Sequence, residues 1–277
     1  MLNLRLQGKT LSFEVPVVMG VLNVTPDSFS DGGRFREVGR AVEHGLELAA
    51  QGASIIDVGG ESTRPGAAAV PVGEELGRVI PVVERLAANG LVVSIDTRHA
   101  VVAEAALAHG AVMVNDVSGL RDPAMRVVAA RYGAPVVIMH MPRGGPGTMQ
   151  NHARYVDVVG EVIHFLARQV VVARESGVEQ VIVDPGIGFG KTTAHNVELI
   201  RRLEEIVSLG HPVLVGASRK RFIGDITGVD QPGDRLAGTL AAHLAALDRG
   251  AVIVRVHDVA EHVQAVRMWC SLNGRLP

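Results

Sequence analysis

The sequence predicts a closed (β/α)8 barrel, or TIM barrel, because short apolar runs alternate with longer amphipathic segments along the chain. The chain has 277 residues, a length that suits a single barrel of this class. The apolar runs are nearly continuous in Val and Ile, which is typical of parallel strands buried on both faces. Eight such runs are present, and they begin near Val17, Ser54, Leu91, Ala111, Pro135, Val181, Pro212 and Ala251.

The segments between these runs have the pattern of helices that pack one face on a sheet. The clearest are Arg40–Gln51, Glu74–Asn89, Ala100–His109 and Val156–Ser176. Several are followed by glycine, the residue that most easily adopts the left-handed conformation past a helix end. A doubly wound open sheet is the alternative, but it would normally have a GxGxxG loop after an early strand, and none follows the first strand here.

The start of the chain predicts one further small element. Leu2, Leu4 and Leu6 alternate with polar residues, and Gly8 precedes a second short run. Residues 1–14 are therefore expected to form a β-hairpin, in a position to close the bottom of the barrel. Because no low-complexity linker interrupts residues 1–277, we expect a single domain.

Composition narrows the class of protein. Hydrophobic residues make up 47% and charged residues 20%, which favours a large core over disorder. The net charge of -2, without acidic or basic blocks, gives no sign of nucleic-acid binding. The N-terminus lacks the long apolar stretch that is typical of a signal peptide, and no charge-free apolar run of about 18 residues occurs. Cys270 is the one cysteine and cannot form an internal disulfide. We therefore expect a cytoplasmic protein without membrane or nucleic-acid partners.

Polar residues recur at the ends of the predicted strands, where the active sites of such barrels form. They are Asn23, Asp57, Asp96, Asn115, His140, Asp184, Ser218, Arg255 and His257. Such groups are unfavourable to bury without a partner or a ligand. Period-2 alternation places Arg255 and His257 on one face. For Asp57 a structural ion pair or helix cap is an equally good interpretation, and the role of His140 stays open.

Four glycine-rich loops follow strands, at residues 23–33, 59–66, 184–192 and 216–224. Glycine lets backbone N–H groups approach an anion, although any one such loop could equally be a tight turn. The loops after the last two strands, the usual phosphate-binding region, contain Ser218, Arg219, Lys220, Arg255 and His257. Asp96, Asn115 and Asp184 suit the edge of a flat amino-oxo heterocycle. The residues alone thus predict an enzyme that binds a polar heterocycle and a phosphate.

At these loops the sequence resembles the dihydropteroate synthases, the folate-pathway enzymes that sulfonamides inhibit. The matching stretches are GVLNVTPDSFSDGG, GGESTRPG, SIDT, VNDVSG, IMHM with TMQ, DPGIGFGK, GASRKRFIG, DRLAGTLAA and IVRVHDV, in family order. The resemblance implies condensation of (7,8-dihydropterin-6-yl)methyl diphosphate with p-aminobenzoate, giving 7,8-dihydropteroate and pyrophosphate by an SN1-like displacement. It also implies a Mg2+ cofactor and a homodimer. Apolar residues of the last helix could serve that dimer or the core, namely Val263, Val266, Met268 and Trp269.

The resemblance also assigns roles to individual residues. The family's pterin pocket corresponds to Asp96, Asn115, Asp184, Lys220 and Arg255. The p-aminobenzoate pocket corresponds to Thr63, Arg64, Pro65, Phe189, Ser218 and Lys220. The pyrophosphate site corresponds to Asn23, Thr63, Arg64, Arg255 and His257, with Mg2+ near Asn23. The catalytic set that the resemblance implies is Asn23, Asp31, Arg255 and His257.

Two other functions compete with a synthase. A methyltetrahydrofolate methyltransferase would share the pterin-pocket acids but would have no reason to contain STRPG and SRK. A pterin-binding paralogue without activity would be expected to lack Asn23, Arg64, Arg255 or His257, and all four are present. One departure from the family pattern is the PRGGPG loop after the fifth strand, which is one residue longer. We expect it to change the shape of the loop rather than the reaction.

Overall fold

Eight parallel strands form a closed barrel in the computed structural model, which describes residues 3–6, 8–25, 34–62, 70–142 and 153–275. The strands are β3 (Val17–Asn23), β4 (Ile55–Gly59), β5 (Val93–Asp96), β6 (Met113–Asp116), β7 (Val136–Met139), β8 (Val181–Asp184), β9 (Leu214–Val215) and β10 (Ile253–Val256). Their hydrogen-bonded order is β8-β7-β6-β5-β4-β3-β10-β9. The N–H of Val183 donates to the carbonyl of Pro212 at 2.9 Å, which joins β8 to β9 and closes the ring. The predicted barrel is confirmed.

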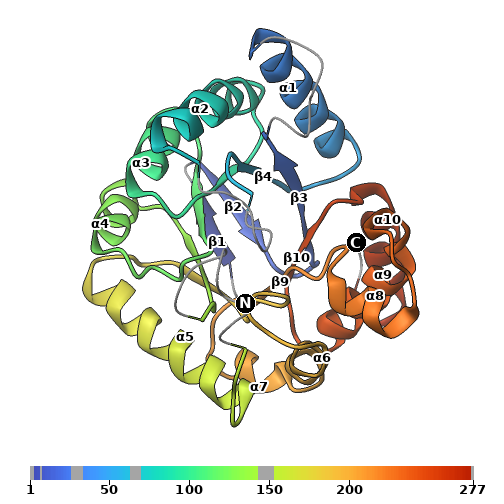
Figure 1. Ribbon diagram of the computed structural model, residues 1–277. Helices are drawn as coiled ribbons and strands as arrows, with labels where there is room; N and C mark the ends of the chain where they lie inside the picture. Colours follow the sequence, from blue (N-terminus) through green and yellow to red (C-terminus); the bar gives the residue numbers. More distant parts are fainter. Residues whose placement is uncertain (1–2, 7, 26–33, 63–69, 143–152, 276–277) are drawn as a thin grey trace.

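Helices surround the strands in chain order (Figure 1). They are α1 (Arg34–Ala50), α2 (Val72–Ala88), α3 (Ala100–Ala108), α4 (Pro123–Tyr132), α5 (Val158–Glu175), α6 (Thr193–Arg201), α7 (Leu203–Val207), α8 (Arg221–Thr227), α9 (Leu236–Asp248) and α10 (Val259–Leu272), with a 3-10 turn at Pro232–Asp234. Helix α1 begins before the expected Arg40 because it continues through Gly39, a residue that ordinarily weakens a helix. None of the described helices combines the length and the apolar composition needed to cross a membrane.

A β-hairpin closes the N-terminal end of the barrel. Strands β1 (Asn3–Leu6) and β2 (Lys9–Ser12) pair antiparallel, and Leu4, Leu6 and Phe13 are buried. They pack on the inward-facing residues of the strands, which are Val17, Met19, Ile55, Met113, Val137, Ile182, Leu214 and Ile253. The expected hairpin is therefore confirmed where the structure describes it. Because apolar side chains fill this end, polar groups inside the barrel are confined to the opposite end.

A second apolar layer lies between the strands and the helices. Val18, Ile56 and Val114 point outward from their strands into this layer, where they join residues of the helices such as Val83 and Leu86. This alternation, with one residue inside the barrel and the next against the helices, explains why the strands are apolar nearly throughout. It also fixes which residues at each strand end face the barrel mouth.

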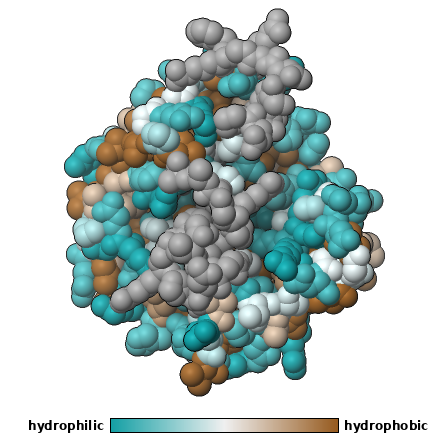
Figure 2. Space-filling model, viewed as in Figure 1, coloured by the Kyte–Doolittle hydropathy of each residue, from teal (hydrophilic) through white to brown (hydrophobic). Residues whose placement is uncertain are grey.

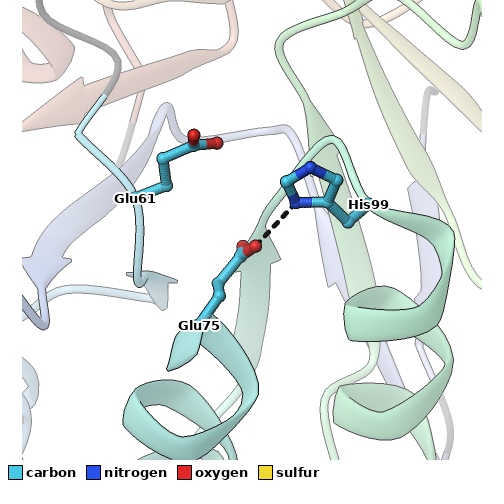
Figure 3. Close-up of side chains that lie close together, drawn as sticks. All are labelled: Glu61, Glu75 and His99. Carbon is cyan, nitrogen blue, oxygen red and sulfur yellow. Dashed lines mark hydrogen bonds and ion pairs between the residues drawn. The ribbon is translucent and has the colours of Figure 1, made fainter. Parts of the chain in front are cut away.

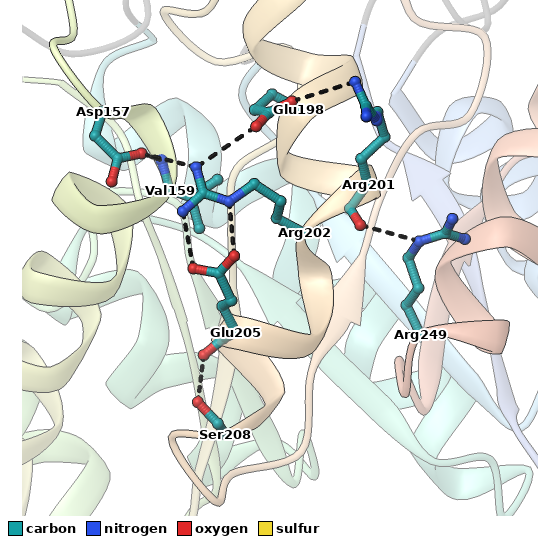
Figure 4. Close-up of polar contacts among 8 residues, drawn as sticks. All are labelled: Asp157, Val159, Glu198, Arg201, Arg202, Glu205, Ser208 and Arg249. Atoms are coloured by element: carbon teal, nitrogen blue, oxygen red, sulfur yellow. Dashed lines mark hydrogen bonds and ion pairs between the residues drawn. The ribbon is translucent and has the colours of Figure 1, made fainter.

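Ion pairs connect the outer helices on one side of the barrel (Figure 4). Arg202, between α6 and α7, donates to Glu205 at 2.6 and 2.9 Å and to Asp157, the residue before α5, at 3.1 Å. Nearby, Arg249 at the end of α9 donates to the carbonyl of Arg201 at 3.2 Å. Because the side chain of Arg202 is 34% exposed, water and salt weaken these pairs, and they contribute little to stability.

The packing of the hairpin predicts the effect of Leu4→Ala. Leu4 is 2% exposed, so truncation should leave a cavity under the barrel and lower the free energy of unfolding by about 2–4 kcal/mol. Urea denaturation followed by circular dichroism would measure this. Val101→Ala on α3 is the matched control, since Val101 is 60% exposed and its truncation should change the free energy by no more than about 0.5 kcal/mol. Equal effects would show that the hairpin does not stabilise the barrel.

Candidate active site

The inward-facing polar residues meet at the C-terminal end of the barrel. Strand register places Asp96 beside Asn115, and Gly59 beside both Asn23 and Asp96. Asp184 ends β8, next to Met139 of β7. The polar residues thus form a ring at the end opposite the apolar hairpin, as the strand-end rule predicts. Viewed from the same direction as in Figure 1, the described part of the surface is mainly hydrophilic, with hydrophobic residues in small groups (Figure 2).

Arg255 lies at the centre of this ring and is held by two carboxylates. Its Nε donates to Asp57 Oδ2 and its Nη2 donates to Asp96 Oδ2, both at 2.6 Å. Asn115 Nδ2 donates to the same Asp57 oxygen at 2.9 Å. Asp57, fully buried, therefore has the ion-pair role that the sequence left open, and it orients both Arg255 and Asn115.

The charges of this network perturb one another. Burial raises the pKa of Asp96 to about 7, with Arg255 opposing the rise and the nearby carboxylate of Asp57 adding to it. Burial acts against the charge of Arg255, but the carboxylates of Asp57 and Asp96 outweigh it and raise the pKa of the guanidinium. Arg255 therefore stays charged, whereas Asp96 can take up a proton near neutral pH.

The loop after β8 is held from inside by a buried ammonium group. Lys191 Nζ lies 3.0 Å from His140 Nδ1 and donates to the carbonyls of Gly186 at 2.9 Å and Phe189 at 3.0 Å. Burial, reinforced by the charge of Lys191, lowers the pKa of His140 to about 2, so its ring is a neutral acceptor. His140, whose role could not be decided from the sequence, therefore helps to hold the loop in place. Gly186 N–H in turn donates to Asp184 Oδ1 at 2.6 Å.

Lys220 and Phe189 lie together beside this loop. Lys220 Nζ lies 4.4 Å from the centre of the Phe189 ring, a cation–π contact, and donates to the carbonyl of Ile187. Burial lowers the pKa of Lys220 to about 8, and the carboxylate of Asp184 opposes that shift. A side chain at Gly188 would crowd Lys220, because its Cβ would lie 2.7 Å from Lys220 Cδ. Gly188 also has a φ of 81°, a conformation that favours glycine.

Ser218 and His257 meet at the ends of β9 and β10. Ser218 Oγ accepts a hydrogen bond from the His257 N–H at 3.2 Å and lies 2.9 Å from His257 Nδ1. Arg219 follows Ser218 and pairs with Asp258, its Nε donating to Asp258 Oδ2 at 3.0 Å. The two loops of the expected phosphate region are therefore joined to each other.

The structure brings most of the predicted site residues together. Those in the described ring or its loops are Asn23, Asp96, Asn115, Asp184, Phe189, Ser218, Lys220, Arg255 and His257. Asn23 ends β3 and is partly exposed. Asp31, Thr63, Arg64 and Pro65 lie outside the described residues, and so does most of the longer loop after β7.

A group of metal-ligand side chains lies beside the ring (Figure 3). One ligand atom each of Glu61, Glu75 and His99 lies within 4.8 Å of the others, which is close enough to hold an ion. All three already have partners. Arg98 donates to both oxygens of Glu61 at 2.9 Å, and the buried Glu75 lies 2.7 Å from His99 Nδ1. The charge of Arg98 opposes a second cation. These contacts instead hold Glu61, after β4, and Glu75, in α2, against the residues that follow β5.

Comparison with known proteins decides the family. The family model of pterin-binding enzymes matches residues 19–257. The dihydropteroate synthase of Synechocystis is 49% identical over 259 residues, which are 92% of this chain and 89% of that protein. The chain belongs to the dihydropteroate synthase family. A Xanthomonas albilineans dihydropteroate synthase, solved with 4-aminobenzoic acid, superposes with a TM-score of 0.93 at 50% identity, covering 99% of each chain.

A longer relative contains the same unit. A Haloferax volcanii protein, named as a probable bifunctional folylpolyglutamate synthase/dihydropteroate synthase, is 51% identical over 262 residues. These residues are 94% of this chain but 31% of that protein. The match to the dihydropteroate synthase family therefore extends over the whole barrel and its ring of polar residues.

The ion-pair network predicts that Asp57→Ala is strongly destabilising. Removing the carboxylate leaves the Arg255 guanidinium with Asp96 as its remaining described partner, so the free energy of unfolding should fall by about 3–5 kcal/mol. Urea denaturation at neutral pH would measure the change. The control is Glu47→Ala on α1, where the side chain is 62% exposed and the expected change is below about 0.5 kcal/mol. A loss as small as in the control would show that Asp57 does not hold Arg255.

Proposed function

We propose that this synthase condenses (7,8-dihydropterin-6-yl)methyl diphosphate with p-aminobenzoate to give 7,8-dihydropteroate and pyrophosphate, in folate biosynthesis. The observation that carries the proposal is the position of the Arg255 guanidinium, which Asp57 and Asp96 hold at the barrel mouth. Arg255 precedes His257 by two residues, so both lie on one face of the strand end. Related enzymes support it. The X. albilineans enzyme has been solved with 7,8-dihydropteroate at 47% identity, and the Thermus thermophilus enzyme with 6HMPPP at 46% identity.

The pterin would bind in the ring of acids and amide. Asn115 donates its amide N–H to Asp57, which leaves its amide oxygen to accept from the pterin. Asp184 accepts from Gly186 through Oδ1, which leaves Oδ2 for ligand donors. These oxygens, with those of Asp96, match the N–H donors of a pterin edge. Lys220 would contact the ring from the side of the loop after β8, and Arg255 would stack along it.

The p-aminobenzoate would bind between the loops after β8, β9 and β4. Phe189 and Lys220 form one wall, joined by their cation–π contact. Ser218 would bind the carboxylate, and Thr63, Arg64 and Pro65 would complete the pocket from the loop after β4. The arylamine would then lie close to the pterin methylene, because both pockets share Lys220.

The pyrophosphate would lie against Asn23, Thr63, Arg64, Arg255 and His257. Mg2+ typically takes one or two protein oxygens and completes its shell with substrate phosphates and water. The single amide oxygen of Asn23 at the end of β3 fits that donor set, whereas Glu61, Glu75 and His99 are engaged with other residues. When bound, Mg2+ would neutralise part of the charge of the leaving pyrophosphate.

Departure of pyrophosphate is the demanding step, since a neutral arylamine needs little activation. As the C–O bond breaks, Arg255 and His257 would stabilise the charge that grows on the leaving group. The electron-rich dihydropterin shares positive charge at its methylene, which favours an SN1-like path. Asp31 would hold that methylene, and closed loops would exclude water. The arylamine nitrogen then forms the C–N bond and loses a proton.

A homodimer is part of the same proposal, and α10 supplies a candidate surface. Met268 and Leu272 are exposed, whereas Val266 and Trp269 are buried and belong to the core. Of the four apolar residues considered from the sequence, Met268 therefore fits an interface best. Light scattering coupled to size exclusion would measure the molar mass in solution.

Pyrophosphate release tests the proposed reaction. With pterin diphosphate and Mg2+, release should depend on p-aminobenzoate and yield dihydropteroate. Arg255→Ala should lower kcat by about 100-fold or more, because it removes a preorganised cation from the leaving group. Arg202→Ala is the matched control, since Arg202 lies between outer helices and should leave kcat unchanged. Pterin binding without any pyrophosphate release would contradict the synthase and favour the inactive paralogue.

The pKa of Asp96 predicts a pH dependence for pterin binding. Its pKa is raised from 3.8 to about 7, so the carboxylate that accepts pterin N–H groups forms as pH rises through that value. The KM for the pterin diphosphate should therefore fall between about pH 6 and 7.5, and Asp96→Asn should flatten the profile. The contribution of Asp96 to the stability of the fold changes with pH in the opposite direction. The folded protein binds this proton more tightly than the unfolded chain, so Asp96 contributes less stability as pH rises from 3.8 to about 7. A pterin KM that rises over this range would contradict the assignment.

A further inference from the structure

Two side chains of α9 hold the backbone on either side of Ser218. His243 Nε2 accepts a hydrogen bond from the Ala217 N–H at 2.9 Å, and Thr239 Oγ1 accepts one from the Arg219 N–H at 3.1 Å. Thr239 and His243 are four residues apart, so they lie on the same face of the helix. Both are almost completely buried, with 0% and 1% exposure. The turn that presents Ser218 is therefore fixed from below by side-chain acceptors.

This turn has an unfavourable backbone conformation that needs such support. Arg219 has a φ of 59°, in the left-handed region that residues other than glycine seldom adopt. Its carbonyl accepts a hydrogen bond from Arg235 Nη1 at 3.0 Å, and its own guanidinium pairs with Asp258. Loss of either α9 acceptor would leave a buried N–H without a partner and would let the turn relax.

The acceptor on His243 depends on a second buried histidine. His243 Nδ1 lies 2.9 Å from His262 Nε2, and His262 Nδ1 lies 2.5 Å from the carbonyl oxygen of Asp258. The Ala217 N–H can only donate, so His243 Nε2 must be unprotonated and its proton must be on Nδ1. His243 Nδ1–H therefore donates to His262 Nε2, and His262 Nδ1–H donates to the carbonyl oxygen of Asp258. The Ala217 N–H at one end and the Asp258 carbonyl at the other thus fix the tautomers of both neutral rings.

The surroundings favour the neutral rings. Burial lowers the pKa of His243, and the cationic or titratable groups that face it, which are His262, Lys220 and His257, lower it further. Burial also lowers the pKa of His262, while Asp258 and Glu261 on its own helix oppose that shift. The side chain of Asp258 is itself paired with Arg219. A proton added to His243 Nε2 would point at the Ala217 N–H and remove its acceptor.

We propose that the His243–His262 pair positions the carboxylate site for p-aminobenzoate, and that protonation of His243 in acid releases the Ser218 turn and weakens binding of that substrate. The inference rests on the proposed function, in which Ser218 binds the carboxylate. His243 and His262 are positioning residues, since they act through the backbone of Ala217 and Asp258. The same chain of hydrogen bonds joins the loop after β9 to the end of β10, where His257 contacts Ser218.

Paired variants of His243 test the kinetic part. His243→Leu keeps the bulk but removes the acceptor, so the KM for p-aminobenzoate should rise about tenfold, as for one buried donor left unpaired. The KM for the pterin diphosphate should rise by less than that, because Asp96, Asn115 and Asp184 lie on other strands. His243→Gln places an amide oxygen near the position of Nε2 and should restore the p-aminobenzoate KM at pH 7.5. Equal increases in both KM values, or a Gln variant as impaired as the Leu variant, would overturn the proposal.

The pH profile of the Gln variant tests the protonation step and does not depend on how the Leu variant folds. As the pH falls well below about 6.5, the ordinary pKa of histidine, the KM for p-aminobenzoate should rise more steeply in the wild type than in His243→Gln, because glutamine does not titrate. Titration of the substrate itself is common to both proteins and cancels in the comparison. Identical acid limbs would contradict the proposal.

Nuclear magnetic resonance of the substrate-free protein separates this inference from the proposed function. With 15N-labelled histidine, His243 and His262 should both appear as neutral Nδ1–H tautomers at pH 7. An Nε2–H tautomer or a charged ring for His243 at that pH would overturn the pair as described, whatever the enzyme catalyses. If the tautomers are as expected but no pyrophosphate is released, the proposed function fails instead.

Discussion

The guanidinium of Arg255 lies between two carboxylates inside a barrel whose other end is filled with apolar side chains, and the geometry of the site follows from this ion pair. Asp57 and Asp96 fix the cation, and the same Asp57 oxygen orients the amide of Asn115. The guanidinium of Arg255 is partly buried, with 22% of its side chain exposed, and such partners offset the cost of removing it from water. The strands of the barrel supply these residues at fixed register, so their relative positions do not depend on flexible loops.

The loops that complete the site are held in a similar way, by buried polar groups beneath them. Lys191 donates hydrogen bonds to carbonyls of the loop after β8, and His243 and Thr239 accept hydrogen bonds from the turn after β9. Glu75 connects the start of α2 to the end of β5 through Thr97 at 2.7 Å. In each case a buried group beneath the loop determines where residues of the proposed site lie, which is the form of preorganisation that electrostatic catalysis requires.

The fold could be predicted well from the sequence because its strands are apolar on both faces and its helices are followed by glycine. Strand ends and period-2 alternation also placed Asp96, Asp184 and Arg255 at one end of the barrel. The partners could not be predicted in the same way. Asp57 and Arg255 are separated by 198 positions, and no local pattern relates them. His243 and His262 lie on different helices, and a lysine in a glycine-rich loop, such as Lys191, ordinarily points to solvent. The substrate roles of all the site residues remain predictions, and Asp31, Thr63, Arg64 and Pro65 also lie outside the described part of the chain.

Gly186 limits how the sequence of this enzyme can vary. Its φ is 69°, and a Cβ there would overlap the carbonyl oxygen of His140, which is backbone and cannot rotate away. Any other residue must therefore push β7 and the loop after β8 apart, irrespective of its polarity or charge. By contrast, a Cβ at Gly39 or Gly73 would meet no atom within 4 Å. Substitutions that alter the neighbouring proposed pocket are therefore expected at side chains such as that of Phe189, whereas position 186 should remain glycine.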